Sequence, residues 1–338
     1  MATTEIPLRP EIPERLRVAA RQGIIVPFVG AGVSQLGGCP RWDAFANAAL
    51  DFFRRPGMLD HAQFDQLSQL RSRTKLSVAI GLEEEYKLQI DFKAILKPDP
   101  NREALGHEIY GHLGQLAKTF ITTNYDDWFE KPPPPGKLAV DAAGARAKDV
   151  EPIVRRTPLY SFRDFTENAL ATPHNVLHIH GSILDRKSMV LTTSEYLRRY
   201  ASHGLVGKAF EENSYLTFLE HLFRTRCVLF IGYGLDEMEI LEYILQKSRT
   251  VEPEPSLTAP REEPNHFLLQ GFYSHEAALM RSFRQYYLRE CNVALLPYSK
   301  DARGWEQLID VVQYLSSEIP IGGLLPSQKR LAMEALLT

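Results

Sequence analysis

The sequence predicts an α/β protein built on a Rossmann-like, doubly wound parallel sheet, and three observations lead to this fold class. Short apolar segments rich in β-branched and aromatic residues recur along the chain and end at polar or glycine turns. Segments in which apolar residues recur at helical spacing separate most of them. The apolar segments are continuous rather than alternating, which is typical of strands buried on both faces of a sheet.

Six segments carry the strand pattern. The first, residues 23–34 (GIIVPFVGAGVS), combines a buried strand, a tight glycine turn and the start of a helix. The other five lie at residues 118–123, 175–179, 227–231, 266–269 and 293–296. Helices are predicted at residues 210–224, 236–247 and 305–317.

Between residues 41 and 114 the pattern changes to amphipathic helices, such as WDAFANAALDFF and HAQFDQLSQLR. This is more helix than one crossover needs, so we expect a helical lobe over residues 41–114, inserted into a single domain that spans residues 1–338. Loops are predicted at residues 131–136 (KPPPPG), 142–148 and 251–264. Strand signals resume after the proline run, so we interpret it as a loop between strands of one sheet and not as a linker between domains.

Composition excludes several classes of function. The net charge of −3 and the pI near 6.4 give no bulk attraction for nucleic acid or for an anionic membrane surface. We find no apolar segment of membrane-spanning length and no secretory signal, so we expect a cytoplasmic protein.

The cysteines Cys39, Cys227 and Cys291 are scattered without a CxxC pair. We therefore expect three buried cysteines, no zinc module and no metal site.

The glycine bend, Gly30-Ala31-Gly32-Val33-Ser34, follows the first strand. Glycines allow the backbone to approach a pyrophosphate closely, and the amides at a helix start point toward negative charge. The same pattern also occurs as a simple tight turn. The third glycine of the usual dinucleotide motif is missing here.

A second polar element, Thr122-Thr123-Asn124-Tyr125-Asp126, follows the strand at residues 118–123. Ligands of open parallel sheets bind beyond the carboxyl ends of the strands, so these side chains are expected to face a ligand. Asn124 can exchange hydrogen bonds with a ribose or an amide. The alternative is that Asn124 and Asp126 cap a helix beginning at residues 126–130 (DDWFE).

Two further elements end later strands. In HIHGS, His178 and His180 point to the same face, and His180 lies closer to the ligand edge and can accept a proton near neutral pH. We expect His178 to be an interior histidine. In IGYGLD, Gly232 and Tyr233 can close a pocket over a ribose or adenine, and the alternative is a plain strand-to-helix turn with Asp236 near the helix start.

Taken in this order, the four elements resemble the sirtuin-like (Sir2-like) family. GAGVS resembles its glycine-rich NAD loop, TTNYD its threonine-glutamine-asparagine-aspartate stretch, HIHGS its histidine-glycine motif and IGYG its later ribose and adenine loop. The segment GGCPRWDAF is similar to a signature of bacterial members. The resemblance spans roughly residues 20–318, and the ordered set is far more specific than any single motif.

The resemblance implies a role for each motif residue. Asn124 and His180 would be catalytic. The residues expected to contact NAD, the substrate, are Gly30, Ala31, Gly32, Ser34, Thr123, Asp126, Gly232 and Tyr233.

Two departures from the family pattern bear on the reaction. The four-cysteine zinc module of deacylating sirtuins is missing, and Thr123 replaces their glutamine. Both favour the branch that hydrolyses NAD to nicotinamide and ADP-ribose in bacterial anti-phage defence, through abortive infection. Because such activity is toxic, we expect control by homo-oligomerisation or by a partner such as a HerA-type ATPase. The alternatives are a protein deacylase, an ADP-ribosyltransferase and a non-catalytic module that senses NAD or ADP-ribose. The choice between NAD and NADP stays open.

Overall fold

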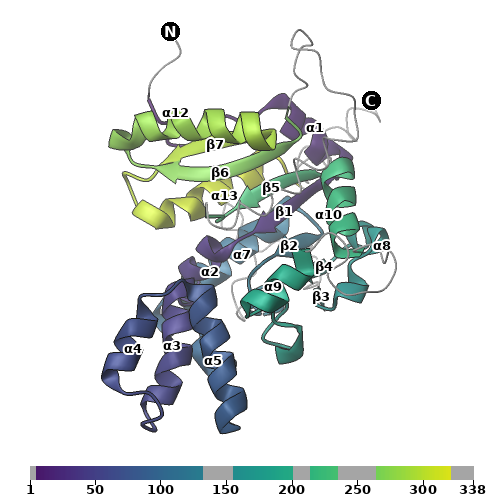
Figure 1. Cartoon of the computed structure of the whole chain (residues 1–338). Coiled ribbons are helices and arrows are strands. Elements are labelled where there is room, and N and C mark those ends of the chain that lie inside the picture. Colours follow the sequence, from purple (N-terminus) through teal and green to yellow (C-terminus); the bar gives the residue numbers. More distant parts are fainter. Residues whose placement is uncertain (1–4, 132–154, 201–213, 235–263, 321–338) are drawn as a thin grey trace, which may run out of the picture.

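The computed structural model describes residues 5–131, 155–200, 214–234 and 264–320 (Figure 1). Its centre is a seven-stranded sheet in the order β3-β4-β2-β1-β5-β6-β7, and every strand pair is parallel. The strands are β1 Ile25–Val29, β2 Phe120–Thr122, β3 Thr157–Leu159, β4 Asn175–His178, β5 Cys227–Ile231, β6 His266–Phe272 and β7 Val293–Ser299. The predicted fold class, a Rossmann-like α/β sheet, is confirmed.

All six predicted strands are present, and β6 and β7 each run three residues beyond the predicted ends. The strand β3 was not predicted. It has three residues, includes Pro158 and, among the described strands, pairs only with β4 at the edge of the sheet. Proline is tolerated at a sheet edge, but it removes the strand signal from the sequence.

Helices cover both faces of the sheet, because alternate residues of each strand point to opposite sides. In β5, Leu229 and Ile231 join the core shared with α1, α2, α7 and α13, whereas Val228 and Phe230 join the core shared with α8, α10 and α12. The bounds are α1 Glu14–Gln22, α2 Ala31–Leu36, α7 Glu103–Leu116, α8 Glu167–Ala171, α9 Thr193–Tyr200, α10 Ser214–Thr225, α12 Ala277–Tyr286 and α13 Gln307–Glu318. No helix in the described ranges is long and apolar enough to cross a membrane.

Short helical turns join these elements: η1 Pro100–Arg102, η2 Phe162–Asp164, η3 Arg186–Ser188, η4 Ser274–Glu276, the π-helical η5 Tyr287–Cys291 and η6 Gly304–Glu306. The helices predicted at residues 210–224 and 305–317 correspond to α10 and to η6 with α13. The helix predicted at residues 236–247 lies outside the described residues. So do the loops predicted at residues 131–136, 142–148 and 251–264, apart from residues 131 and 264.

The helical lobe consists of α3 Trp42–Arg54, α4 His61–Ser68, α5 Ser72–Tyr86 and α6 Phe92–Ile95, and it projects from the sheet (Figure 1). The lobe has its own apolar core. Three residues from the loops that follow β2 and β4 also belong to this core: Tyr125, Met189 and Leu191. The lobe therefore adjoins the carboxyl edge of the sheet. The predicted lobe range, 41–114, also includes most of α7, which packs on the sheet beside α13 instead.

Candidate active site

A cavity of about 1150 Å³ lies at the carboxyl edge of the sheet, where β1, β2, β4 and β5 end. Ligand pockets typically enclose roughly 300–1,000 Å³, so this cavity has room for a large ligand. The predicted residues that line it are Ala31, Gly32, Ser34, Thr123, Asn124, Asp126, His180, Gly232 and Tyr233. The structure thus brings the four sequence elements to one place, and of the predicted residues only Gly30 does not line the cavity.

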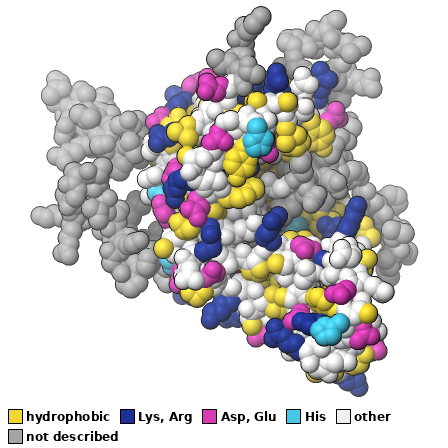
Figure 2. Space-filling view, turned by 90° about the vertical axis from the view of Figure 1, so that its left-hand side faces the viewer, with side chains coloured by type: hydrophobic (Ala, Val, Ile, Leu, Met, Phe, Trp, Pro, Cys, Tyr) yellow, Lys and Arg dark blue, Asp and Glu magenta, His cyan; other side chains and the backbone are white. Residues whose placement is uncertain are grey.

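Charge is mixed on the side of the molecule where the lobe lies below and the α12 end of the sheet lies above (Figure 2). Over the described part of this face, Lys and Arg side chains are interspersed with Asp and Glu. The cationic residues that line the cavity are Arg41, Arg73, Arg102 and Lys300. Lys300 lies 3.9 Å from the Glu276 carboxylate, so part of this positive charge is already balanced.

The glycine bend packs directly against the loop that follows β5. The Gly32 amide donates a hydrogen bond of 2.9 Å to the Gly232 carbonyl, and the Gly30 amide donates to the Ile231 carbonyl at 2.9 Å. A Cβ on Gly32 would lie 2.9 Å from the Gly232 oxygen, and Gly232 has φ +68°, a conformation that favours glycine. These glycines therefore hold two loops together. The amide of Gly32 is engaged by the protein itself.

Asn124 is buried beside the glycine bend. Its Nδ2 donates to the Gly30 carbonyl at 3.0 Å, and its backbone amide donates to the Thr122 hydroxyl at 3.0 Å. These contacts tie the loop after β2 to the end of β1, the neighbouring strand. Asn124 is therefore held at the cavity wall, and Gly30 contributes the carbonyl that accepts its hydrogen bond.

Ser34 and Asp126 bind each other in the cavity wall. The Ser34 hydroxyl donates to Asp126 Oδ2 at 2.5 Å, and Tyr110 of α7 donates to Oδ1 at 3.4 Å. Burial raises the pKa of Asp126, and the hydrogen bonds from Ser34 and from the Trp128 amide oppose that rise. The Trp128 contact is a capping interaction, but residues 126–130 form a turn and not the helix considered above.

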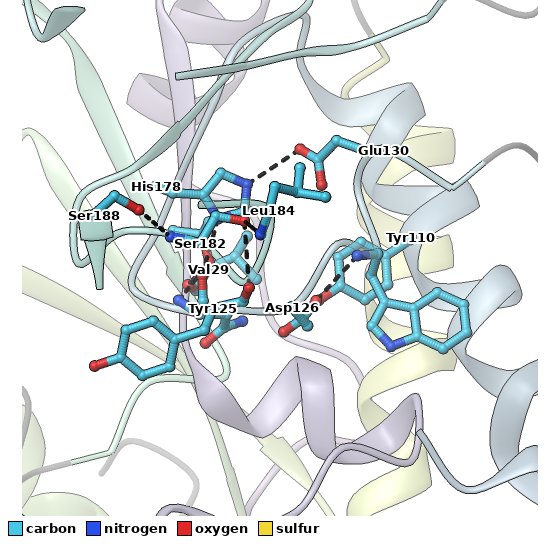
Figure 3. Close-up of polar contacts among 12 residues, drawn as sticks. Val29, Tyr110, Tyr125, Asp126, Glu130, His178, Ser182, Leu184 and Ser188 are labelled. Atoms are coloured by element: carbon cyan, nitrogen blue, oxygen red, sulfur yellow. Dashed lines mark hydrogen bonds and ion pairs between the residues drawn. The ribbon is translucent and has the colours of Figure 1, made fainter. Parts of the chain in front are cut away.

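His178 is fully buried, as expected for an interior histidine, and Figure 3 shows its ring beside Glu130. Nδ1 lies 3.0 Å from the Asn124 carbonyl and Nε2 lies 3.1 Å from Glu130 Oε1. Both partners are acceptors, so both ring nitrogens must donate and the ring is an imidazolium. Burial alone would lower the pKa of His178, but the hydrogen bond and charge of Glu130 raise it above its ordinary value. His178 therefore fixes the backbone that carries Asn124.

His180 lines the cavity and keeps a neutral ring. Burial, together with the positive charges of Arg199 and Arg73, lowers its pKa to about 3. Its Nε2 lies 2.8 Å from the Tyr200 hydroxyl. The expectation that His180 titrates near neutral pH is not met in this environment, because the ring is desolvated and faces two cations. A neutral imidazole is nevertheless a good hydrogen-bond acceptor or donor.

Gly181 makes the chain turn sharply after His180. It has φ +87°, and a Cβ there would lie only 2.2 Å from the Ser188 carbonyl oxygen. The turn brings the following loop back under the site, where the Ser182 amide donates to the Ser188 hydroxyl and the Val190 amide donates to the His180 carbonyl. The glycine of HIHGS is thus needed for backbone geometry beside the histidine.

Two polar atoms in the cavity wall are buried without a hydrogen-bond partner in the described chain: Thr123 Oγ1 and Gln270 Oε1. Unsatisfied buried polar atoms are rare, and a bound ligand commonly supplies the missing partner. Tyr233 adds an aromatic wall, held edge to face against Phe28 at 5.3 Å and against Phe230 at 5.6 Å. The cavity therefore suits a ligand with hydroxyl or amide groups and planar rings.

Several site residues were missed by sequence reasoning. Tyr110, Tyr196, Tyr200 and Arg73 all lie on helices, where their spacing also fits an apolar or amphipathic stripe. Only the pair Tyr196 and Tyr200, four residues apart in SEYLRRY, gave a signal that they share one helix face. In the described ranges, no group of three or more His, Cys, Asp or Glu side chains could hold a metal ion.

Fold and cavity together define a doubly wound α/β protein with a polar ligand site at the topological switch point of its sheet. The model of the SIR2-like domain family matches residues 118–295, just over half of the chain. The chain belongs to the SIR2-like domain family, and this membership indicates an NAD-utilising enzyme. The matched range includes Asn124, His180 and Gly232 but begins after the glycine bend. A search of curated proteins gives no match.

Proposed function

We propose that this chain is an NAD glycohydrolase, which cleaves NAD to nicotinamide and ADP-ribose. The observation that carries the proposal is that Asn124 and His180 line one cavity with the glycine bend. Asn124 and His180 follow β2 and β4, which are adjacent parallel strands. The family assignment supports NAD as the ligand, and the cavity volume and the unpartnered polar atoms fit a molecule of that size and polarity.

The residues that would hold NAD follow from the cavity wall. Ala31 and Gly32 offer a surface without bulky side chains, so a phosphate group can approach the backbone closely. Thr123 Oγ1 has no hydrogen-bond partner in the described chain, and a polar group of NAD would supply that partner. Gly232 and Tyr233 form the wall on the β5 side, where a ring or a ribose can pack.

The proposed reaction places few demands on the protein. Nicotinamide leaves with the electron pair of the glycosidic bond, which neutralises its ring, and the sugar passes through an oxocarbenium-like transition state. Water forms the new bond to the ribose carbon and releases one proton. Asn124 orients the ribose and the water, and neutral His180 accepts a hydrogen bond from a ribose hydroxyl or from the water.

The cysteines favour hydrolysis over protein deacylation. The zinc module of deacylating sirtuins needs four cysteines, whereas this chain has three, and Cys39, Cys227 and Cys291 are all buried and form no disulfide. Burial raises the pKa of the Cys39 and Cys227 thiols, which disfavours the thiolates that zinc requires. A peptide cleft of the zinc-supported kind is therefore not expected.

The decisive experiment measures nicotinamide and ADP-ribose after incubation of the full chain with NAD, with and without candidate partner proteins. We expect release by the wild type and by Tyr314→Phe, a control at a residue that does not line the cavity, and a loss of at least about 100-fold in Asn124→Ala and His180→Ala. Full activity in either site variant would contradict the proposal. Deacylated peptide together with acetyl-ADP-ribose would favour a protein deacylase, and ADP-ribosylated protein would favour an ADP-ribosyltransferase. Binding of NAD without turnover would favour a non-catalytic sensing module.

We also propose that NAD consumption serves bacterial anti-phage defence by abortive infection. Support comes from the resemblance of the motifs to that branch of the family, and from the need to restrain a toxic activity through homo-oligomerisation or a partner such as a HerA-type ATPase. The test is phage plating on cells that express the wild type or Asn124→Ala, with cellular NAD measured in parallel. Equal protection by both chains, or none by either, would contradict a defence role based on NAD loss.

A further inference from the structure

The helical lobe forms part of the cavity wall near both proposed catalytic residues. Trp42 of α3 and Arg73 of α5 line the cavity. The ring of Trp42 is stacked on the ring of Tyr125, which follows Asn124 in the chain, with a centroid separation of 5.7 Å and an angle of 26°. Arg73 contacts α9, the helix that packs against His180. The lobe therefore reaches the surroundings of both Asn124 and His180.

Arg73, Tyr196 and His180 form a stack of side chains in the cavity wall. The guanidinium carbon of Arg73 lies 3.5 Å from the centre of the Tyr196 ring. This separation is van der Waals contact, so no further atom fits between the two groups. The Tyr196 ring meets the His180 ring at a centroid separation of 5.7 Å and an angle of 65°. All three residues line the cavity, so side chains fill its wall from the lobe to the proposed catalytic ring.

The turn of α5 that carries Arg73 is hydrogen-bonded to the start of α9. The hydroxyl of Ser77, one helical turn after Arg73, donates to the Arg73 carbonyl at 2.9 Å. The same hydroxyl accepts from the amide of Thr193, the first residue of α9, at 2.9 Å. Tyr196 lies one turn further along α9. The contact between Arg73 and Tyr196 is therefore set by the packing of two helices as well as by the two side chains.

Arg73 is the lobe's contribution to this stack, and its side chain is half-buried. Truncation of Arg73 at Cβ would uncover the lobe side of the Tyr196 ring and enlarge the cavity near His180. In the proposed reaction, the nucleophile attacks the ribose carbon within hydrogen-bond reach of His180. The free volume at that place therefore limits the size of the nucleophile, and a single methylene can decide between acceptance and rejection.

We propose that Arg73 is a specificity-determining residue, which fills the lobe side of the cavity beside His180 and so favours water over bulkier nucleophiles. This inference rests on the proposed NAD cleavage, in which water attacks near His180. The nucleophiles that Arg73 disfavours are larger alcohols and, by the same argument, the lysine side chain of a protein. The lobe then directs the ADP-ribosyl group to hydrolysis and away from transfer.

The test measures how the full chain partitions the ADP-ribosyl group of NAD between water and added alcohols. The alcohol oxygen forms the bond to the ribose carbon and loses its proton, and nicotinamide leaves with the electron pair of the old bond. Methanol, ethanol and 1-propanol are compared at equal concentration, as alkyl ADP-ribose formed per nicotinamide released. In the wild type, we expect this ratio to fall by about tenfold or more from methanol to 1-propanol.

Three variants separate the volume of Arg73 from its charge. Arg73→Ala should bring the ratio for 1-propanol to within about threefold of that for methanol, because the wall is opened. Arg73→Met keeps a long side chain that packs well on an aromatic ring but carries no charge, and it should keep the wild-type preference. Arg71→Ala removes an exposed arginine of the same segment that does not line the cavity, and it should also behave as the wild type.

An unchanged preference in Arg73→Ala would overturn this proposal, and so would a wild type that takes 1-propanol as readily as methanol. The second comparison needs no variant, so it holds even if Arg73→Ala does not fold. A loss of preference in Arg73→Met would assign the selection to charge and contradict the role of volume. Absence of nicotinamide release by the wild type would refute the proposed function and this proposal with it, whereas release with the wrong partition refutes the role of Arg73 alone.

Discussion

Replacing Gly232 with alanine tests how the glycine bend is held to the end of β5. Gly232 has φ +68°, where a residue with a Cβ costs about 1–2 kcal/mol. The new Cβ would also lie 2.7 Å from the Val33 amide nitrogen and 2.8 Å from Val33 Cγ2. Such crowding in a packed interior costs about 1–3 kcal/mol. We therefore expect Gly232→Ala to lower the free energy of unfolding by about 2–5 kcal/mol.

Gly23 provides a matched control, because it has nearly the same φ, +67°, and no described atom within 4 Å of its added Cβ. Gly23→Ala should lower the free energy of unfolding only by the cost of placing a residue with a Cβ at positive φ, about 1–2 kcal/mol. Urea unfolding of both variants measures the difference, and calorimetric titration with NAD measures binding. We expect weaker NAD binding in Gly232→Ala alone. Equal losses of stability in the two variants would refute the close contact between Gly232 and Val33.

Three further predictions concern single side chains of the site. The folded pKa of His180, about 3, is below its ordinary value of 6.5, so its contribution to stability is complete above pH 6.5 and is lost as the pH falls toward 3. His180→Asn should flatten that decline by up to about 1.4 kcal/mol per pH unit in urea unfolding. For His178 the folded pKa is raised, so its contribution is complete below pH 6.5 and is lost as the pH rises through the folded pKa. Glu130→Gln should therefore cost about 1.5–3 kcal/mol at pH 6 and less at pH 9, and an equal cost at both would contradict the ion pair. Thr123→Val, which removes an unpartnered hydroxyl, should change stability by less than about 0.5 kcal/mol but weaken NAD binding about tenfold in calorimetry, and unchanged affinity would exclude Thr123 from the ligand contacts.

The sequence contained enough information for most of the fold, because strands buried on both faces leave continuous apolar runs. In β5, all five residues are buried, and the corresponding sequence, CVLFI, is a continuous apolar run that is easily recognised. The edge strand β3 is half exposed and contains a proline, so it leaves no such pattern. The helix α7 shows apolar spacing like that of the lobe helices, and periodicity cannot tell which body a helix packs against.

The candidate site was predictable only where its residues follow strands. The segments with Asn124 and His180 were found because parallel strands end at the same edge of a sheet. Tyr110 and Tyr200 reach the site from helices, and their contacts depend on tertiary packing that no local pattern contains. The low pKa of His180 likewise depends on burial and on Arg73, which is more than 100 residues away in the chain. Local sequence indicated which groups meet, and packing determines their protonation.

Amide hydrogen exchange with and without NAD tests most directly the claim that three distant segments form one NAD site. We predict slower exchange on addition of NAD in peptides that cover residues 30–34, 123–126 and 178–182 together. Peptides from α4, which contributes no residue to the cavity wall, serve as the internal reference and should be unchanged. Protection that misses any one of the three segments, or that appears only elsewhere, would contradict a shared site.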